Sequence, residues 1–380
     1  MQKIVNLLLL FLTFSSQVMA AANCVYQDGQ GPISVTATIP SITIAAGVDA
    51  PLGTVLYRFL YMMPEYNPIT CTADSSLTPY KIFNTYRVTS PMPRSSLSGM
   101  ISVAGYGTPT DIWETGVPGV GVVLQSVNTF LASRTWLPAT VPYSELYAGT
   151  SSKQPVNYNT FIYLIKTGNI SGGTISGAQL PSYALDVTIT PSTGGSPFKN
   201  AAKVNYTGSV NITTMSCITP DVTVSMGTHD VNSKFNGVGS TTDWKDASIQ
   251  LTNCPRAFGM RQDIRYMAES QTTSMGALTN NSVSVTLAPA NGVIDAANGI
   301  FNLNAESDSA EGIGIQIASG LPDSSPQPIN LGSPVTMTFS DTGSALGTVK
   351  LPMSARYIQT ASEVKPGKAN GRLIFTVLYY

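Results

Sequence analysis

The sequence is poor in the residues on which most enzymes and metal sites depend. It contains one histidine, His229, so hydrolase schemes that pair serine or cysteine with histidine lack a base in the first half of the chain. Sites that hold a metal through several histidines are excluded for the same reason. Carboxylates could act as a general base, but no motif organises them, so a hydrolase is the least favoured function. We expect no enzyme activity, no metal and no cofactor.

Charge is also scarce. Only 11% of the residues are charged, and the net charge is −1. The chain has no basic stripe of the kind that binds nucleic acid, and no polybasic or amphipathic segment for a membrane surface. Beyond the N-terminal region, no apolar run is long enough to span a bilayer. We therefore expect no nucleic-acid partner.

The first 20 residues have the composition of a secretory signal peptide. Lys3 gives a basic start, Leu7 to Leu12 an apolar stretch, and Val18-Met19-Ala20 a small-residue cleavage pattern. Cleavage is predicted after Ala20, with Ala22 as the second choice. The mature protein is therefore expected to be exported.

Four cysteines remain: Cys24, Cys71, Cys217 and Cys254. An even number in an exported chain indicates disulfides, and three connectivities are possible. Two cysteines lie close together early and two close together late, which favours Cys24–Cys71 and Cys217–Cys254. Zinc is the alternative, but no CxxC motif or histidine pair supports it.

Apolar and polar residues alternate with a period of two through most of the chain. Ile33 to Ile39, Leu185 to Ile189, Val283 to Leu287 and Val335 to Phe339 show this pattern, which predicts half-buried strands. Clusters of Gly, Pro, Asn, Asp and Ser separate the strands, and no convincing amphipathic helix is present. Many short strands with frequent turns predict an all-β fold, a β-sandwich or barrel.

One stretch, "TPSTGGSPF" from Thr190 to Phe198, has the composition of a linker. It follows a clear strand and divides the mature chain into two pieces of similar length, each with one cysteine pair. We therefore predict two domains, residues 21–190 and 204–380, joined by a linker at 191–203.

The second piece contains four segments in a characteristic order. They are "SVNITTMSCITPDVTVSMGTHDV", "ASIQLTNCP", "AEGIGIQI" and "LPMSARYIQTASEVKPGKANGRLIFTVLYY". This order resembles the pilin domain of chaperone–usher fimbriae of Gram-negative bacteria, the type 1 fimbrial family, over residues 204–380. Gly367 lies fourteen places from the end, counting Tyr380 as one, and Tyr379 is the penultimate aromatic residue. Both fit the C-terminal pattern of the family.

The resemblance implies an immunoglobulin-like β-sandwich that lacks its last strand, so that a hydrophobic groove lies beside the final strand of the chain. In the family, a periplasmic chaperone fills the groove first and anchors the terminal carboxylate, and the next subunit then fills it with a donor strand, a form of β-augmentation. The uncharged tail fits this mechanism, because a bare apolar edge strand would aggregate. We expect the groove to be faced by Leu373, Phe375, Val377 and Tyr379, with the carboxylate of Tyr380 as the chaperone's handle. The alternative is an edge strand of a complete sandwich.

The first piece indicates where such a subunit would lie in a fibre. Cys24 is close to the mature N-terminus, so we expect no donor strand there. The resemblance then implies a two-domain tip adhesin: two immunoglobulin-like sandwiches in tandem, the first binding a receptor. The segments "WETGVPGVGVVL" and "FIYLIKTGNISGGTISG" also look like those of fimbrial tip proteins, although no residues match the pocket of the mannose-binding adhesin.

A fimbrial tip adhesin would pass through the periplasm to the cell surface. Its expected partners are the periplasmic chaperone, the outer-membrane usher, the next subunit, and a host glycan or protein receptor, with a glycan favoured. The alternative function is a structural tip or adaptor subunit that binds no receptor.

Sugar sites combine an aromatic platform with side chains that hydrogen-bond hydroxyl groups, and they usually lie on loops. Three segments of the first piece meet this description: "SRTWLPATVPYSELYAG", "MMPEYNPITCTAD" and "QPVNYNTF". The alternative for each is a solvated loop whose aromatic residue pins it to the core. The candidate receptor-binding residues are Arg134, Trp136, Tyr143, Glu145, Tyr66, Asn67, Asn157 and Tyr158.

Overall fold

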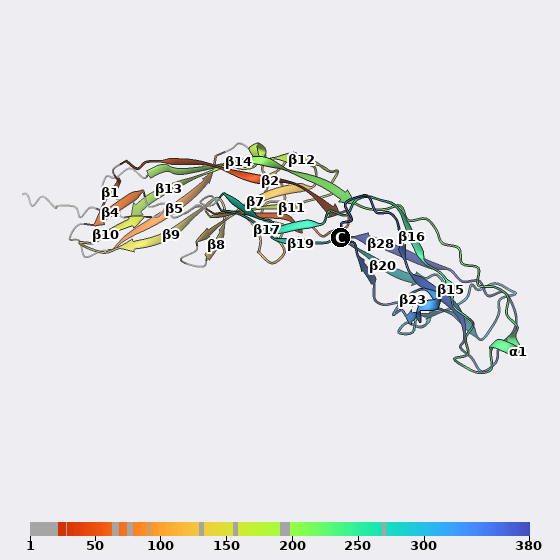
Figure 1. Ribbon diagram of the computed structural model, residues 1–380. Helices are drawn as coiled ribbons and strands as arrows, with labels where there is room; N and C mark the ends of the chain where they lie inside the picture. Colours follow the sequence, from red (N-terminus) through yellow and green to blue (C-terminus); the bar gives the residue numbers. More distant parts are fainter. Residues whose placement is uncertain are drawn as a thin grey trace, which may run out of the picture.

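The computed structural model describes residues 22–27, 29–62, 68–73, 79–89, 92–128, 133–154, 159–190, 198–267 and 271–380. The chain forms two β-rich lobes that lie end to end, with the C-terminus at the place where they meet (Figure 1). The expected all-β fold of tandem sandwiches is confirmed. Within the described ranges, no helix is both long and apolar enough to cross a membrane. The expected signal peptide lies outside the described residues.

Two large sheets face each other in the first lobe. One contains, in order, β12 (Gly173–Ser176), β14 (Phe198–Met215), β13 (Tyr183–Thr190), β5 (Tyr80–Val88) and β9 (Ala139–Leu146), with β2 (Ile33–Gly47) parallel to β14. The other contains β18 (Thr272–Ser274), β17 (Met260–Met267), β3 (Val55–Met62), β11 (Thr160–Lys166), β7 (Val120–Asn128) and β6 (Trp113–Glu114); β19 (Ala277–Thr279) pairs with β17, and β8 (Ser133–Trp136) with β7.

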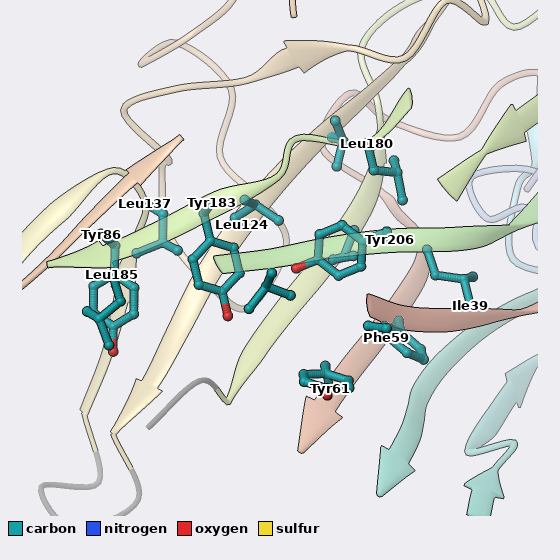
Figure 2. Packing of buried hydrophobic residues seen from close by; sticks show 14 of the residues in the cluster. Ile39, Phe59, Tyr61, Tyr86, Leu124, Leu137, Leu180, Tyr183, Leu185 and Tyr206 are labelled. Atoms are coloured by element: carbon teal, nitrogen blue, oxygen red, sulfur yellow. The ribbon is translucent and has the colours of Figure 1, made fainter. Parts of the chain in front are cut away.

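The main core lies between these two sheets. Inward-facing side chains such as Phe59, Tyr183 and Leu185 are fully buried there (Figure 2). The alternation of Ile33 to Ile39 in β2 is therefore one between core and surface, whereas in β13 the polar Asp186 is buried as well. The outer face of the β3–β11–β7 sheet has a second core of its own, because the segment from residue 92 to 112 covers it with Ile101, Val103 and Ile112.

A third, small sheet closes the far end of the first lobe. It consists of β1 (Ala22–Tyr26), β4 (Ile69–Ala73) and β10 (Ser151–Gln154). Cys24 and Cys71 face each other across β1 and β4 and form a disulfide, and Cys217 and Cys254 form the second. The predicted pairing is confirmed.

The second lobe has three sheets. The first contains β15 (Lys245–Asp246), β27 (Met353–Gln359), β23 (Ile313–Ser319), β22 (Ile300–Phe301) and β21 (Val293–Asp295), with β24 (Gln327–Pro328) on β23. The others are β16 (Ile249–Cys254) with β26 (Gly347–Leu351), and β25 (Val335–Thr338) with β20 (Ser282–Pro289) and β28 (Leu373–Tyr379). The helical elements are short: η1 (Gly177–Gln179), α1 (Val231–Lys234) and η2 (Pro322–Ser324).

The two lobes do not divide the chain at residues 190–204, where the boundary between the domains was expected. Residues 198–203, expected in the linker, begin β14 and pair with β13, and β14 continues beyond residue 204 as a partner of β2 and β12 in the first lobe. The strand β17, expected in the second domain, lies parallel to β3 in the first lobe. Its residue Ile264 is fully buried in the first core. Two segments from the second half of the sequence therefore complete the sheets of the first lobe.

Hydrogen bonds from Asn281 join the lobes at their junction. Its fully buried amide donates to the backbone oxygen of Ala45 over 2.9 Å and accepts from the backbone N–H of Gly259 over 3.0 Å. It also donates to the backbone oxygen of Tyr380 over 3.3 Å. The strand β28 adds a contact, because the backbone N–H of Tyr379 donates to Asp49. The C-terminal residues are thus bonded to the end of β2.

Candidate assembly groove and receptor site

An apolar groove runs through the second lobe, with a volume of 720 Å³. Its floor comes from inward-facing residues of several strands, including Leu287, Phe301, Ile315 and Met353. One wall is the segment 222–228, and the other is β28 with the preceding residues 369–371. The β15–β27–β23–β22–β21 sheet and the β25–β20–β28 sheet therefore both contribute residues to the groove.

Neither wall of the groove has a strand neighbour on the groove side in the described structure. The strand β28 pairs with β20 alone, and residues 221–230 belong to no strand. Val224 and Met226 nevertheless alternate inward along that segment and pack against the second core. An extended segment inserted between the walls would find backbone donors and acceptors on both sides and apolar contacts beneath.

Alternate residues of β28 face the core of the second lobe, and two of the four residues expected at the groove line it. Leu373 and Phe375 line the groove, while Val377 and Tyr379 pack on the same core, with Tyr379 only 4% exposed. Ile374 points outward and is half exposed. Tyr380 lies at the junction, where its backbone oxygen accepts from the N–H of Ser282 over 2.9 Å.

Gly367 allows the loop before β28 to pack closely against a neighbouring loop. It lies on the loop before β28, which packs against the acidic loop 306–311. A Cβ atom at Gly367 would lie 2.5 Å from the backbone nitrogen of Ala310. Flanking ion pairs join the loops, Lys365 to Glu311 over 2.6 Å and Lys368 to Asp308 over 2.8 Å. Only glycine permits this close contact.

We expect Gly367→Ala to destabilise the second lobe by roughly 1–3 kcal/mol, because the added methyl group must push two backbone segments apart. Urea unfolding of the full chain measures the change. Gly31→Ala is the matched control, since a Cβ there meets nothing within 4 Å and should change stability by no more than about 0.5 kcal/mol. Equal stability of the two variants would contradict the close packing described for this loop.

A second candidate site lies on the outer face of the β3–β11–β7 sheet, and we call it the arginine–aromatic cluster. Its members are Arg58 on β3, Phe161 and Tyr163 on β11, Arg134 and Trp136 on β8, and Tyr106 from the covering segment. Strand register places them together: Arg58 is paired with Tyr163, and Gln125 of β7 is paired with both Phe161 and Trp136. Side chains that are paired across strands share one face of a sheet.

The arginines of the cluster stack on its rings. The guanidinium carbon of Arg58 lies 4.8 Å from the ring centroid of Tyr106 and 5.1 Å from that of Phe161. Arg134 lies 5.2 Å from the ring of Phe161 on the solvent side. The rings also contact one another, with Trp136 and Tyr163 edge to face at 5.4 Å. Cation–π contacts of this kind are strongest where water is excluded.

Burial controls the electrostatics of the cluster. It lowers the pKa of Arg58 below its ordinary value, and the nearby cations Arg134 and Arg265 act in the same direction. Burial raises the pKa of Tyr163 to about 12, a rise that Arg58 and Arg134 oppose. Arg58 forms an ion pair with Asp263, which comes from β17. The first-lobe site therefore includes residues from the second half of the chain.

The structure separates the receptor-binding candidates that the sequence grouped together. Arg134 and Trp136 lie on β8 in the cluster, but Glu145 lies on β9 in the opposite sheet, where it approaches Lys81 and accepts from Tyr147. The segment expected to be one loop is thus two strands in different sheets. The remaining candidates Tyr66, Asn67, Asn157 and Tyr158 lie outside the described residues, as does the side chain of Tyr143.

Sequence reasoning missed Arg58, Tyr106, Phe161 and Tyr163. The available signal was Arg58 itself, a charged residue inside the otherwise apolar strand "VLYRFLYM". A charge in such a strand needs a partner or a function, because burying it unpaired costs several kcal/mol, on the order of 3–5 when a partner is removed. The partner, Asp263, is 205 residues away in sequence.

The fold is thus a tandem of two sandwiches, and the second has an open groove beside its last strand. Residues 204–380 match the family described as fimbrial protein. Fimbrial proteins are structural and binding proteins, which agrees with the expectation that the chain is not an enzyme. A search of curated proteins gave no match.

Several solved structures are similar to the chain. The CupB6 tip adhesin from Pseudomonas aeruginosa is 16% identical, with 94% of this chain and 95% of that chain covered and a TM-score of 0.33. A structure of the chaperone–tip subunit complex CsuC–CsuE from Csu pili of Acinetobacter baumannii is 12% identical, with 94% of this chain and 100% of that chain covered and a TM-score of 0.23. An antigen and type I fimbria protein of Burkholderia pseudomallei is 23% identical, with 43% of this chain and 91% of that chain covered and a TM-score of 0.26. With TM-scores this low, these similarities assign no function to the chain.

Proposed function

We propose that the protein is the tip adhesin of a chaperone–usher fimbria, which accepts a strand from the next subunit and binds a receptor through its first lobe. The observation that carries this proposal is an asymmetry between the lobes. The groove of the second lobe is open along β28. The residues from Ala22 onward are already paired in β1, and Cys24 is bonded to Cys71. These residues are therefore not available as a donor strand.

Assembly would follow from the exposed groove. An open strand edge above apolar side chains associates with other strands, so it must be covered during export. A periplasmic chaperone would cover it first, and the next subunit would replace the chaperone at the outer-membrane usher. In this scheme Leu373, Phe375, Val377 and Tyr379 face the incoming strand. We propose that the chaperone anchors the carboxylate of Tyr380. This role would require the Tyr380 oxygen to break its hydrogen bond with the Asn281 amide.

Receptor binding is tested on arrays of glycans and matrix proteins. The protein used is the full chain, extended at its C-terminus by a strand that folds back and fills the groove. We expect reproducible binding to a glycan that Trp136→Ala abolishes, because this half-buried ring is the aromatic platform of the site. Trp244→Ala is the matched control, since Trp244 lies in the second lobe, where Arg356 stacks on it at 4.1 Å. No binding to any glycan or matrix protein would support the alternative, a structural tip or adaptor subunit.

A further inference from the structure

The arginine–aromatic cluster carries more positive than negative charge. Arg134 and Arg265 lie close enough to Arg58 to help lower the pKa of Arg58, and Asp263 is the carboxylate bonded to Arg58. The register of β17 on β3 pairs Arg265 with Leu60, and Leu60 is paired with Phe161, so Arg265 extends the same face of the sheet. A protein with few charges has thus placed three arginines on one face.

One of these arginines has an unused donor. The Arg58 side chain is only 7% exposed, and its Nε atom has no hydrogen-bond partner among the described residues. Buried polar groups are nearly always satisfied, so an unpaired donor indicates a missing acceptor. An anionic oxygen would be the strongest acceptor for it.

Two side-chain acceptors of the cluster already accept a hydrogen bond within it. The side-chain oxygen of Gln125 accepts from the Tyr163 hydroxyl over 2.7 Å, and Gln125 is only 3% exposed. Asp263 accepts from Arg58. A neutral sugar would need such acceptors for its hydroxyl hydrogens. The groups open to solvent are the Asp263 carboxylate, whose side chain is 39% exposed, and the guanidinium groups of Arg134 and Arg265 beside the half-buried rings of Trp136 and Tyr106. The exposed cations therefore outnumber the exposed carboxylate.

We propose that this cluster binds an acidic saccharide. The sugar ring would lie against Trp136 and Tyr106, and its carboxylate or sulfate group would bind the guanidinium of Arg134, with Arg58 and Arg265 adding positive charge. A planar guanidinium binds either oxyanion through two parallel hydrogen bonds. This inference rests on the proposed receptor function of the first lobe and specifies the chemistry of its ligand.

The test uses the full chain with its groove filled, and an array of glycan pairs that differ only by a sialic acid carboxylate or by a sulfate group. We expect binding to the acidic member of at least one pair, with the carboxylate and sulfate pairs separating the two sources of charge. Calorimetry with the best glycan should show a Kd about tenfold higher or more for Arg134→Ala. Added salt should weaken the binding.

The matched control is Lys203→Ala, which removes one exposed cation from β14 in the opposite sheet and should leave the Kd unchanged. Binding to neutral glycans that Trp136→Ala abolishes and Arg134→Ala spares would overturn the acidic ligand while keeping the receptor function. No binding to any glycan or matrix protein would overturn both. Acidic binding that Lys203→Ala weakens as much as Arg134→Ala would show non-specific charge attraction and also overturn the assignment.

Discussion

A chain of residues 22–190, produced alone, is expected not to fold, although the sequence marks residue 190 as the end of a domain. The missing β14 supplies the buried residues Val204, Tyr206, Val210 and Ile212 to the first core and is the strand on which β2 pairs. Burying such side chains contributes roughly 1.5–3 kcal/mol each. Their joint loss approaches the whole stability of a typical domain, about 5–15 kcal/mol.

Circular dichroism and gel filtration of the truncated chain measure this. A chain of residues 22–215 is the matched comparison, because it retains β14 but lacks β17. We expect it to recover much of the strand signal and yet to unfold at a lower temperature than the full chain, since Ile264 and Asp263 are absent. A monomeric 22–190 fragment with the same unfolding midpoint as the 22–215 fragment would contradict the role given to β14.

The sequence was informative where structure is decided locally. The period-two pattern of Leu373 to Tyr379 predicted which side chains face inward, because successive side chains of a strand point to opposite faces. The close spacing of the cysteines predicted both disulfides. The likeness to pilin domains predicted a match to the fimbrial family and a final strand with one open edge, in agreement with the family match and the sheet order.

Long-range strand pairing was not visible in the same way. "TPSTGGSPF" is rich in turn residues, but composition does not tell whether the following strand returns to the sheet that it has just left. Residues 198–204 do return, antiparallel to β13, and β14 runs parallel to β2 from Ala202 onward. Likewise, nothing local to "MRQDIRYM" indicates that it pairs with β3 instead of joining the second lobe. Such pairings depend on which apolar faces remain uncovered once the rest of the chain has folded.

The candidate receptor site shows the same difference between what local sequence predicts and what long-range strand pairing decides. Arg134 and Trp136 were predicted from their aromatic, polar neighbourhood, and they do lie together. Glu145 was grouped with them because it is near in sequence, but β8 and β9 belong to different sheets. Arg58 was passed over because its strand looked like an ordinary buried strand. Its role is visible only once the register places it beside Tyr163.

The largest expected effect concerns the groove. A strand inserted beside β28 would bury part of Leu373, Phe375, Val377 and Val224 together with its own apolar side chains. Burial of several large side chains would stabilise the second lobe by roughly 5 kcal/mol or more, after the ordering cost of the strand. This corresponds to a rise in Tm on the order of 10–20 °C.

The strand can be supplied in cis. A short glycine-containing turn after Tyr380, followed by about seven residues of alternating Val and Thr, would fold back antiparallel to β28. The matched control carries the same residues shifted by one position, which turns every apolar side chain away from the groove. Composition, length and turn are then equal in the two proteins, so that only the register differs.

Thermal unfolding of these two proteins and of the unextended chain tests the central claim, that the second lobe is an incomplete sandwich awaiting a strand. The account predicts a Tm higher by on the order of 10–20 °C for the in-register extension alone, together with loss of self-association in gel filtration. Equal Tm values for all three proteins, with the unextended chain soluble and monomeric without a chaperone, would contradict it.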